Sequence, residues 1–153
     1  MARSNLTRVM DQASPDDWQI AKQAYWRYHI ILSSLSGSLS IPLKTGAAVF
    51  AALSPNNDYL SNVRDAGRML NAKRLGLGID DFKVSTYGAN KRKAWAIVNG
   101  ADPLELIKAN KTRNFFLNIT DPNDPLPVTI DGHIFNAWEN VQPFVRRGYD
   151  YKS

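Results

Sequence analysis

The chain has 153 residues, of which 44% are hydrophobic and 22% are charged, and it contains no cysteine. This length supports one ordinary domain with a single core, and the apolar content excludes an intrinsically disordered chain. The missing cysteines exclude disulfides, thiolate zinc sites, iron–sulfur clusters and a cysteine nucleophile. No apolar run approaches the roughly 18 residues of a membrane span, so we expect a cytoplasmic protein with no membrane partner.

Positive charge gathers in the middle of the chain. The net charge of +5 comes from 19 Lys and Arg against 14 Asp and Glu. Residues 64–113 alone hold eleven basic and five acidic side chains, a net of +6. Such a segment is typical of a face that meets a polyanion, and the alternative is an ordinary solvated basic surface.

The first half of the chain predicts two helices separated by a break. Ser14-Pro15-Asp16-Asp17 is typical of a helix start, with a capping serine and two acids at the positive end of the helix dipole. This helix is expected to reach about Leu35, where Ser36-Gly37-Ser38 breaks it. Residues 45–53 are apolar on nearly every side, which predicts a short, deeply buried helix.

A turn at residues 54–58 leads into the next predicted helix, at about 59–73. Its expected inner face consists of Leu60, Val63, Gly67 and Leu70. Further helices are expected at about 91–98, 103–107 and 111–119, and Asn110 is expected to cap the helix at 111–119. A final helix is expected to begin at Asp131 as its cap and to run through Val141. The four tryptophans lie mostly at helical spacing and are expected in the core. The chain therefore predicts an all-α fold, with residues 1–153 forming a single helical domain.

Four segments, taken in order, resemble motifs of helix-hairpin-helix DNA glycosylases of the endonuclease III type. Leu53-Ser54-Pro55-Asn56-Asn57 is similar to their Leu-Ser-x-Gln/Asn turn. The stretch from Thr86-Tyr87-Gly88 to Ala94 resembles their Thr-x-Gly-x-x-x-x-Lys-Ala helix start. Lys111-Thr112-Arg113-Asn114 through Leu117-Asn118 and Val128 through Phe135 resemble their Lys-Thr-Ala-Asn-x-x-Leu-Asn and Val-Asp-x-His-Ile-Phe motifs. The likeness covers about residues 45–140.

The resemblance implies roles for Asp131 and Lys111. Asp131 falls on the family's catalytic aspartate, and Lys111, twenty positions earlier, falls on the lysine that bifunctional members use as a nucleophile. A carboxylate would stabilise the positive charge that builds on the sugar as the glycosidic bond breaks. The residues alone allow plainer interpretations, in which Asp131 caps a helix and Lys111 is a surface lysine.

The same resemblance implies a set of DNA contacts. Asn56 or Asn57 matches the turn residue that fills the gap left by a flipped nucleotide. Lys108-Ala109-Asn110 stands where the family has a phosphate-binding Gly-x-Gly turn, so phosphate binding there would rest on a basic side chain. The candidate nucleic-acid-binding residues are Asn56, Asn57, Tyr87, Lys91, Lys108, Asn110, Thr112 and Arg113.

The resemblance therefore implies a DNA glycosylase that acts on a flipped base in duplex DNA, with an AP-lyase step if Lys111 is a nucleophile. Two alternatives stay open: a non-catalytic DNA-binding or interaction protein on the same fold, and an enzyme of a phage DNA-modification system that modifies a base. We expect double-stranded DNA as the partner, a monomer, and no metal or other cofactor. The sequence does not identify the base.

Overall fold

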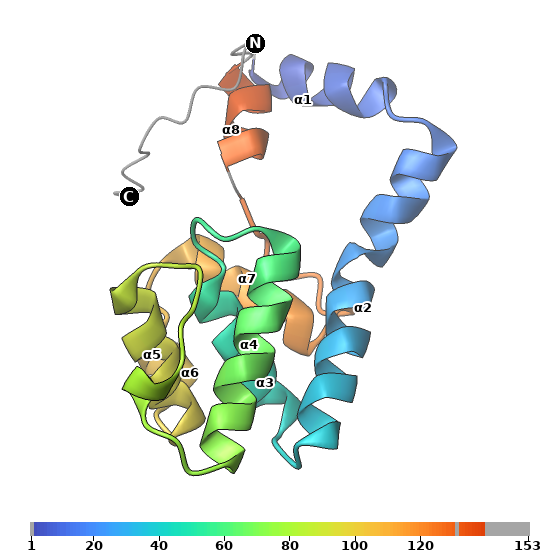
Figure 1. The fold of residues 1–153 in the computed structure, drawn as a ribbon. Coiled ribbons are helices and arrows are strands. Elements are labelled where there is room, and N and C mark those ends of the chain that lie inside the picture. Colours follow the sequence, from blue (N-terminus) through green and yellow to red (C-terminus); the bar gives the residue numbers. More distant parts are fainter. Residues whose placement is uncertain (1, 131, 140–153) are drawn as a thin grey trace. The chain divides into compact units, whose positions relative to one another are not determined.

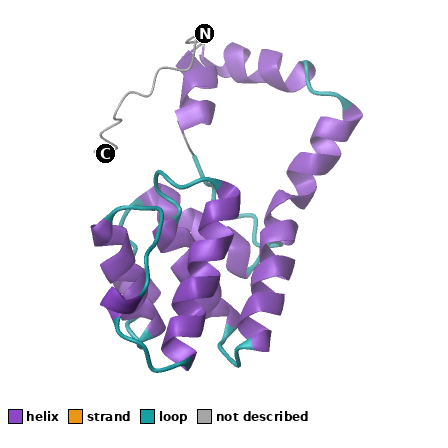
Figure 2. Ribbon diagram, in the orientation of Figure 1, coloured by secondary structure: helices purple, strands orange, loops and turns teal. Residues whose placement is uncertain are grey.

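The computed structural model describes residues 2–130 and 132–139. These residues form helices and loops and no strand, which confirms the all-α prediction (Figure 2). In chain order the elements are α1 (Ala2–Asp11), α2 (Pro15–Ser38), α3 (Leu43–Leu53), α4 (Tyr59–Arg74), the 3-10 turn η1 (Ile79–Asp81), α5 (Gly88–Val98), α6 (Pro103–Leu106), α7 (Asn110–Thr120) and α8 (Gly132–Glu139), as Figure 1 shows. Across the described ranges, no helix combines the length and hydrophobicity required to traverse a bilayer.

The chain divides into two compact units. Unit 1 comprises Met1–Ala24 and Ile130–Ser153, and unit 2 comprises Tyr25–Thr129. In unit 1, α1 packs against α8, and the Asn5 side-chain amide donates to the Trp138 carbonyl oxygen at 2.9 Å. Unit 2 contains helices α3 to α7 and every candidate site residue except Asp131. The single domain expected from the sequence stays a prediction.

Helix α2 begins where the sequence predicts and ends later. The Ser14 hydroxyl accepts from the Asp17 backbone N–H at 3.2 Å, while the Asp17 carboxylate accepts from the Ser14 N–H at 2.9 Å and from its hydroxyl at 2.8 Å. These hydrogen bonds lower the pKa of Asp17. The predicted break at residues 36–38 is wrong, because the helix continues to Ser38 and the chain turns at Ser40, whose φ is +56°.

Helix α3 forms the centre of unit 2, as its apolar sequence predicts. All eight residues from Gly46 to Leu53 are buried, and α4, α5 and α7 pack against the helix. Phe50 lies in an aromatic cluster, with its ring centroid 5.6 Å from that of Tyr28 and 5.9 Å from that of Phe115. A helix that is buried on all sides needs apolar residues on every face, which explains why residues 46–53 of α3 include no polar side chain.

The inner face of α4 differs from the predicted one. Leu70 is buried as expected, but Leu60 is 73% exposed. The buried residues of this helix include two polar ones, Asn62 and Asp65. The start of the helix is capped by Asp58, whose carboxylate accepts from the Ser61 N–H at 3.0 Å.

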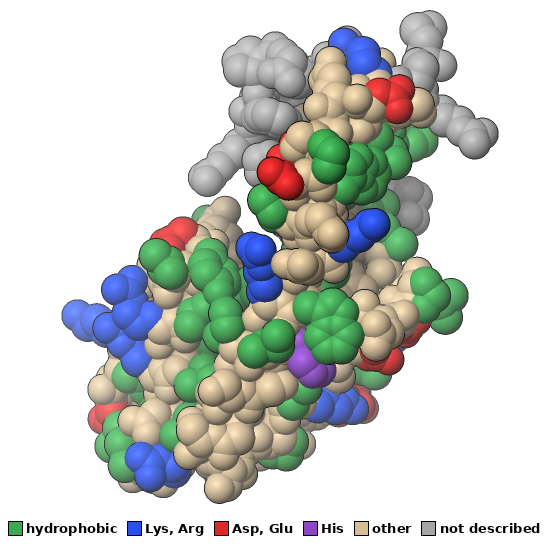
Figure 3. Space-filling view, turned by 90° about the vertical axis from the view of Figure 1, so that its right-hand side faces the viewer, with side chains coloured by type: hydrophobic (Ala, Val, Ile, Leu, Met, Phe, Trp, Pro, Cys, Tyr) green, Lys and Arg blue, Asp and Glu red, His purple; other side chains and the backbone are tan. Residues whose placement is uncertain are grey.

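The tryptophans lie nearer the surface than predicted. Trp95 packs against the core with its ring centroid 5.6 Å from that of Phe82. Trp18, Trp26 and Trp138 are each about 40% exposed. Hydrophobic side chains do reach the surface in the space-filling view (Figure 3). The core prediction therefore holds for Trp95 and is wrong for the other three.

Close packing of α2 on α3 at Gly46 makes a substitution there costly. A Cβ added to Gly46 would lie 2.0 Å from the Ser36 hydroxyl oxygen, in a site where Ser36 is 1% exposed. Gly46→Ala is therefore expected to lower the free energy of unfolding by about 1–3 kcal/mol, measured by urea denaturation.

The matched test is the double variant Ser36→Ala/Gly46→Ala. Without the hydroxyl, the next Ser36 atom is its Cβ at 3.4 Å, a tight contact that the helices can accommodate. The hydroxyl also has no hydrogen-bond partner among the described residues, so its removal leaves no donor unpaired. We expect the double variant to recover most of the lost stability. Purely additive effects would contradict the steric explanation.

Candidate functional site

The turn between α3 and α4 exposes one candidate asparagine and half-buries the other. Asn56 is exposed and has a φ of +54°, a backbone conformation that asparagine adopts more readily than most residues. Asn57 points inward, where its side-chain N–H groups donate to the Asn62 oxygen at 3.5 Å and to the Asp65 carboxylate at 3.2 Å. Of the two candidates for filling a vacated base stack, Asn56 is therefore the more exposed.

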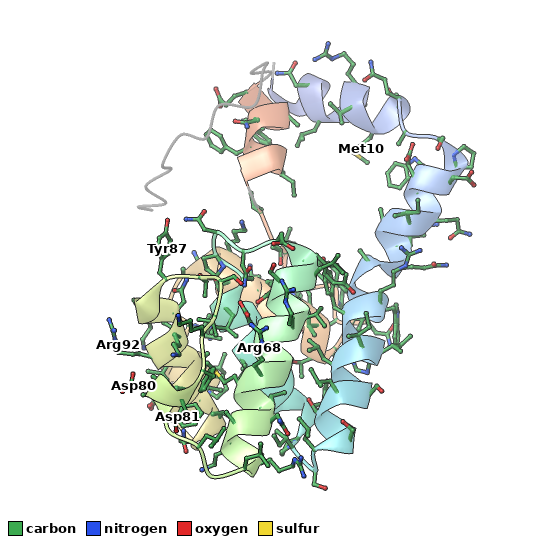
Figure 4. All side chains as sticks on the ribbon, viewed as in Figure 1. Met10, Arg68, Asp80, Asp81, Tyr87 and Arg92 are labelled. Atoms are coloured by element: carbon green, nitrogen blue, oxygen red, sulfur yellow. The ribbon has the colours of Figure 1, made fainter. Side chains whose placement is uncertain are left out.

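A second turn, ahead of α5, is joined to the first. The Asn56 side-chain N–H donates to the Tyr87 hydroxyl at 2.5 Å, and the Thr86 hydroxyl donates to the Pro55 carbonyl oxygen at 2.7 Å. Tyr87 is 62% exposed, and Figure 4 shows its side chain projecting away from the helices of unit 2. Two segments 31 residues apart in the sequence thus present Asn56 and Tyr87 as one exposed pair.

The Lys91 side chain is occupied by contacts within unit 2. Its ammonium group donates to the Phe82 carbonyl oxygen and lies 4.6 Å from the centroid of the Phe82 ring. Such a cation–π contact, combined with a hydrogen bond, holds the residue 82 segment against the start of α5. The next residue, Arg92, is exposed. A DNA contact through Lys91 stays a prediction. For such a contact, the Lys91 ammonium group would have to bind a phosphate in addition to Phe82 or in place of it.

A buried carboxylate beneath the two turns was missed at the sequence level. Asp65 is 0% exposed, and its Oδ2 accepts from the Ser85 backbone N–H at 2.6 Å and from Asn57 at 3.2 Å. Its Oδ1 lies 3.7 Å from a guanidinium nitrogen of Arg68, which is labelled in Figure 4. The available sequence signal was its place three residues after Asn62, because both polar residues occupy an otherwise apolar helix face.

The hairpin that joins α6 to α7 is built without a left-handed residue. Asp102 caps α6 through a 3.0 Å bond from the Leu104 N–H, and Ile107 after this helix is 1% exposed. Ala109 occupies the N-cap position of α7 with φ −67° and makes no side-chain cap bond. The predicted cap at Asn110 is wrong, because Asn110 is already the first residue of the helix.

Several candidate side chains lie exposed around the start of α7. Lys108, Asn110, Lys111 and Arg113 are exposed, and Thr112 is half-buried. The first intrahelical bond runs from the Arg113 N–H to the Ala109 carbonyl oxygen at 2.9 Å. Earlier backbone N–H groups of a helix have no intrahelical acceptor, which favours negative charge at this end. Lysine and arginine side chains here would strengthen the attraction of a phosphate.

One face of α7 holds the segment that leads to residue 131. The Asn114 side chain donates to the Val128 carbonyl oxygen at 2.7 Å, and the Asn118 side chain donates to the Thr129 hydroxyl at 3.0 Å. Around an ideal helix, Lys111 lies about 20° from Asn118 and about 60° from Asn114, so the three residues share a face. Asp131 itself lies outside the described residues.

Most of the central basic side chains are exposed in unit 2. Of the eleven Lys and Arg residues between positions 64 and 113, nine are exposed and two, Lys91 and Lys93, are half-buried. Figure 3 shows Lys and Arg side chains close together at one edge of the face in view. Within the described part of the chain, no three His, Asp or Glu side chains lie together in a way that could hold a metal ion.

A family model, described as a family of unknown function (DUF7178), matches residues 1–145. This match covers nearly the whole chain of 153 residues, including all of unit 2 and position 131. No curated protein and no solved structure matches the chain.

Proposed function

The chain belongs to the DUF7178 family, and we propose that it is a DNA glycosylase that cleaves the bond between a base and its sugar in a nucleotide flipped out of duplex DNA. The observation that carries the proposal is the shared face of α7. There Asn114 and Asn118 bind residues 128 and 129, and Lys111 lies on the same side. The two asparagines of the motif therefore attach the segment that precedes Asp131 to α7.

The proposed chemistry needs a carboxylate and an amine near one sugar. As the glycosidic bond breaks, its electron pair leaves with the base and positive charge develops on the sugar, which the Asp131 carboxylate would stabilise. The neutral Lys111 amine would then form a bond to C1′ and lose a proton, and opening of the sugar ring would give an imine. If Lys111 binds a phosphate instead, water would replace the amine as the nucleophile.

DNA binding in this proposal uses two surfaces of unit 2. The exposed pair of Asn56 and Tyr87 would occupy the gap that a flipped nucleotide leaves in the base stack. The exposed Lys108 and Arg113 at the start of α7 would contact backbone phosphates. Binding should therefore weaken steeply as salt is added, because released counterions contribute to the affinity.

Borohydride trapping tests the proposal. The wild-type protein is incubated with duplex oligonucleotides that carry an abasic site or one of a panel of altered bases, and borohydride reduces any imine to a stable covalent bond. We expect a covalent complex with wild type and none with Lys111→Ala. Lys44→Ala is the matched control, since Lys44 is also exposed and lies in α3, outside the proposed site, and it should trap like wild type.

Two other outcomes of these assays would indicate a different mechanism or a different class of protein. Base release without trapping, lost in Asp131→Asn, would indicate a glycosylase that uses water. Salt-sensitive duplex binding with neither trapping nor base release would contradict the glycosylase. That result would favour a non-catalytic DNA-binding protein or an enzyme that modifies the flipped base.

A further inference from the structure

We propose that Asp65 is a positioning residue that fixes Asn56 and Tyr87 relative to each other, so that two separate turns act as one DNA-contacting unit. The inference rests on the proposed function for its DNA-binding consequence, but the positioning itself is a property of unit 2 alone. Asp65 touches neither exposed side chain. It acts through the neighbours of both, Asn57 in the first turn and Ser85 in the second.

The hydrogen bonds of Asp65 connect three parts of the chain. From α4, its Oδ2 accepts from the Asn57 side chain at 3.2 Å and from the Ser85 backbone N–H at 2.6 Å. Asn57 directly follows Asn56, and Ser85 precedes Tyr87 by two residues. A shift at either bond therefore moves the backbone next to one member of the exposed pair.

The chemistry of this position favours a carboxylate over an amide. Asn57 and Ser85 both present N–H donors to one oxygen of Asp65, Oδ2, and Oδ1 has no hydrogen-bond partner among the described residues. An asparagine at position 65 would have nearly the same shape but one acceptor oxygen and an NH₂ group. With its amide oxygen at the Oδ2 position, the NH₂ group would lie without an acceptor beside the Arg68 guanidinium, which is 3.7 Å from Oδ1. With the amide reversed, the NH₂ group would meet the Ser85 backbone N–H. Either orientation buries a mismatched donor, so the hold of residue 65 on the two turns should weaken.

A second link between the turns does not pass through Asp65. The Thr86 hydroxyl donates to the Pro55 carbonyl oxygen at 2.7 Å and also accepts from the Asn90 side chain at 2.9 Å. These bonds should keep the two turns close when Asp65 is changed. We therefore expect Asp65→Asn to fold, and to lose the alignment of Asn56 and Tyr87 rather than the contact between the turns.

The positioning is tested without DNA by NMR of the Asn56 side-chain amide. In wild type this amide bonds to the Tyr87 hydroxyl, and Tyr87→Phe defines its resonance when that bond is absent. We expect Asp65→Asn to move the Asn56 resonance to the Tyr87→Phe position and to speed exchange of the Ser85 backbone amide at least tenfold. Met69→Val controls for general destabilisation, since Met69 is also buried in α4 but lies outside this cluster, and it should leave both signals unchanged. An unchanged Asn56 resonance in Asp65→Asn would overturn the proposal.

The DNA consequence is measured as a ratio of affinities. The probes are a duplex with a tetrahydrofuran abasic site and the same duplex intact, because only the first offers a gap for Asn56 and Tyr87. We expect wild type to prefer the abasic duplex, and Asp65→Asn and Asn56→Ala each to lower that preference about fivefold to tenfold. The double variant should lose no more than either single one. If the losses of preference in the two single variants add in the double variant, Asp65 does not act through Asn56 and the proposal is overturned. If wild type binds both duplexes equally, the proposed function is contradicted, and the NMR result alone tests the positioning.

Discussion

Replacement of Phe50 by alanine is expected to lower the free energy of unfolding by about 3–5 kcal/mol. Phe50 is 2% exposed at the centre of α3, and its ring packs on Tyr28 from α2 and Phe115 from α7. Truncation would remove the apolar surface shared by three helices and leave a cavity that rigid helices fill only in part. Urea unfolding followed by circular dichroism measures the loss.

Leu60→Ala is the matched control for this prediction. Leu60 is a large apolar residue of α4, but it is 73% exposed, so its truncation should change the free energy of unfolding by less than about 0.5 kcal/mol. A loss below about 1 kcal/mol for Phe50→Ala would contradict the central place of Phe50. Equal losses in both variants would contradict the observed orientation of α4.

Local sequence patterns predicted most helices because their signals lie within a few residues. The run from residue 45 to 53 is apolar throughout, and capping residues such as Ser14 and Asp102 stand directly before the helices that they begin. The inner face of α4 was predicted wrongly because hydrophobic periodicity assigns polar residues such as Asn62 and Asp65 to the surface, whereas both are buried. Burial of Asp65 depends on donors that α4 does not contain, and one of them, Ser85, lies 20 residues away.

The candidate site shows the same division between local and distant information. Asn56 and Tyr87 could each be chosen from their own motifs, but their hydrogen bond spans 31 residues and follows only from the packing of the two turns. Asn114 and Asn118 belong to the glycosylase-like motif at residues 111–118, but the motif alone does not predict what their side chains bind. Their role depends on residues 128 and 129, which fold back onto α7.

The largest functional effect is expected for Asp131→Asn, which should lower the rate of base release about 10²–10³-fold under the proposed mechanism. The substitution keeps the shape of the side chain and removes the negative charge that would stabilise the developing positive charge on the sugar. Single-turnover assays on the duplex identified by trapping measure the chemical step alone. Asp121→Asn is the control, because Asp121 is an exposed carboxylate in the loop after α7 and should leave the rate unchanged. A rate within threefold of wild type for Asp131→Asn would contradict the catalytic role of Asp131.

Asn118→Ala separates the placement of Asp131 from its charge. Asn118 is 4% exposed and binds the Thr129 hydroxyl, so its loss should loosen the chain two residues before Asp131 and slow base release about tenfold. Asn123→Ala, in the exposed loop between α7 and this segment, should have no effect. Because Asn118 would act only by holding residue 129, combining Asn118→Ala with Asp131→Asn should add nothing to the effect of Asp131→Asn alone. Independent, multiplicative losses would instead assign Asn118 to the packing of α7 and separate it from the catalytic step.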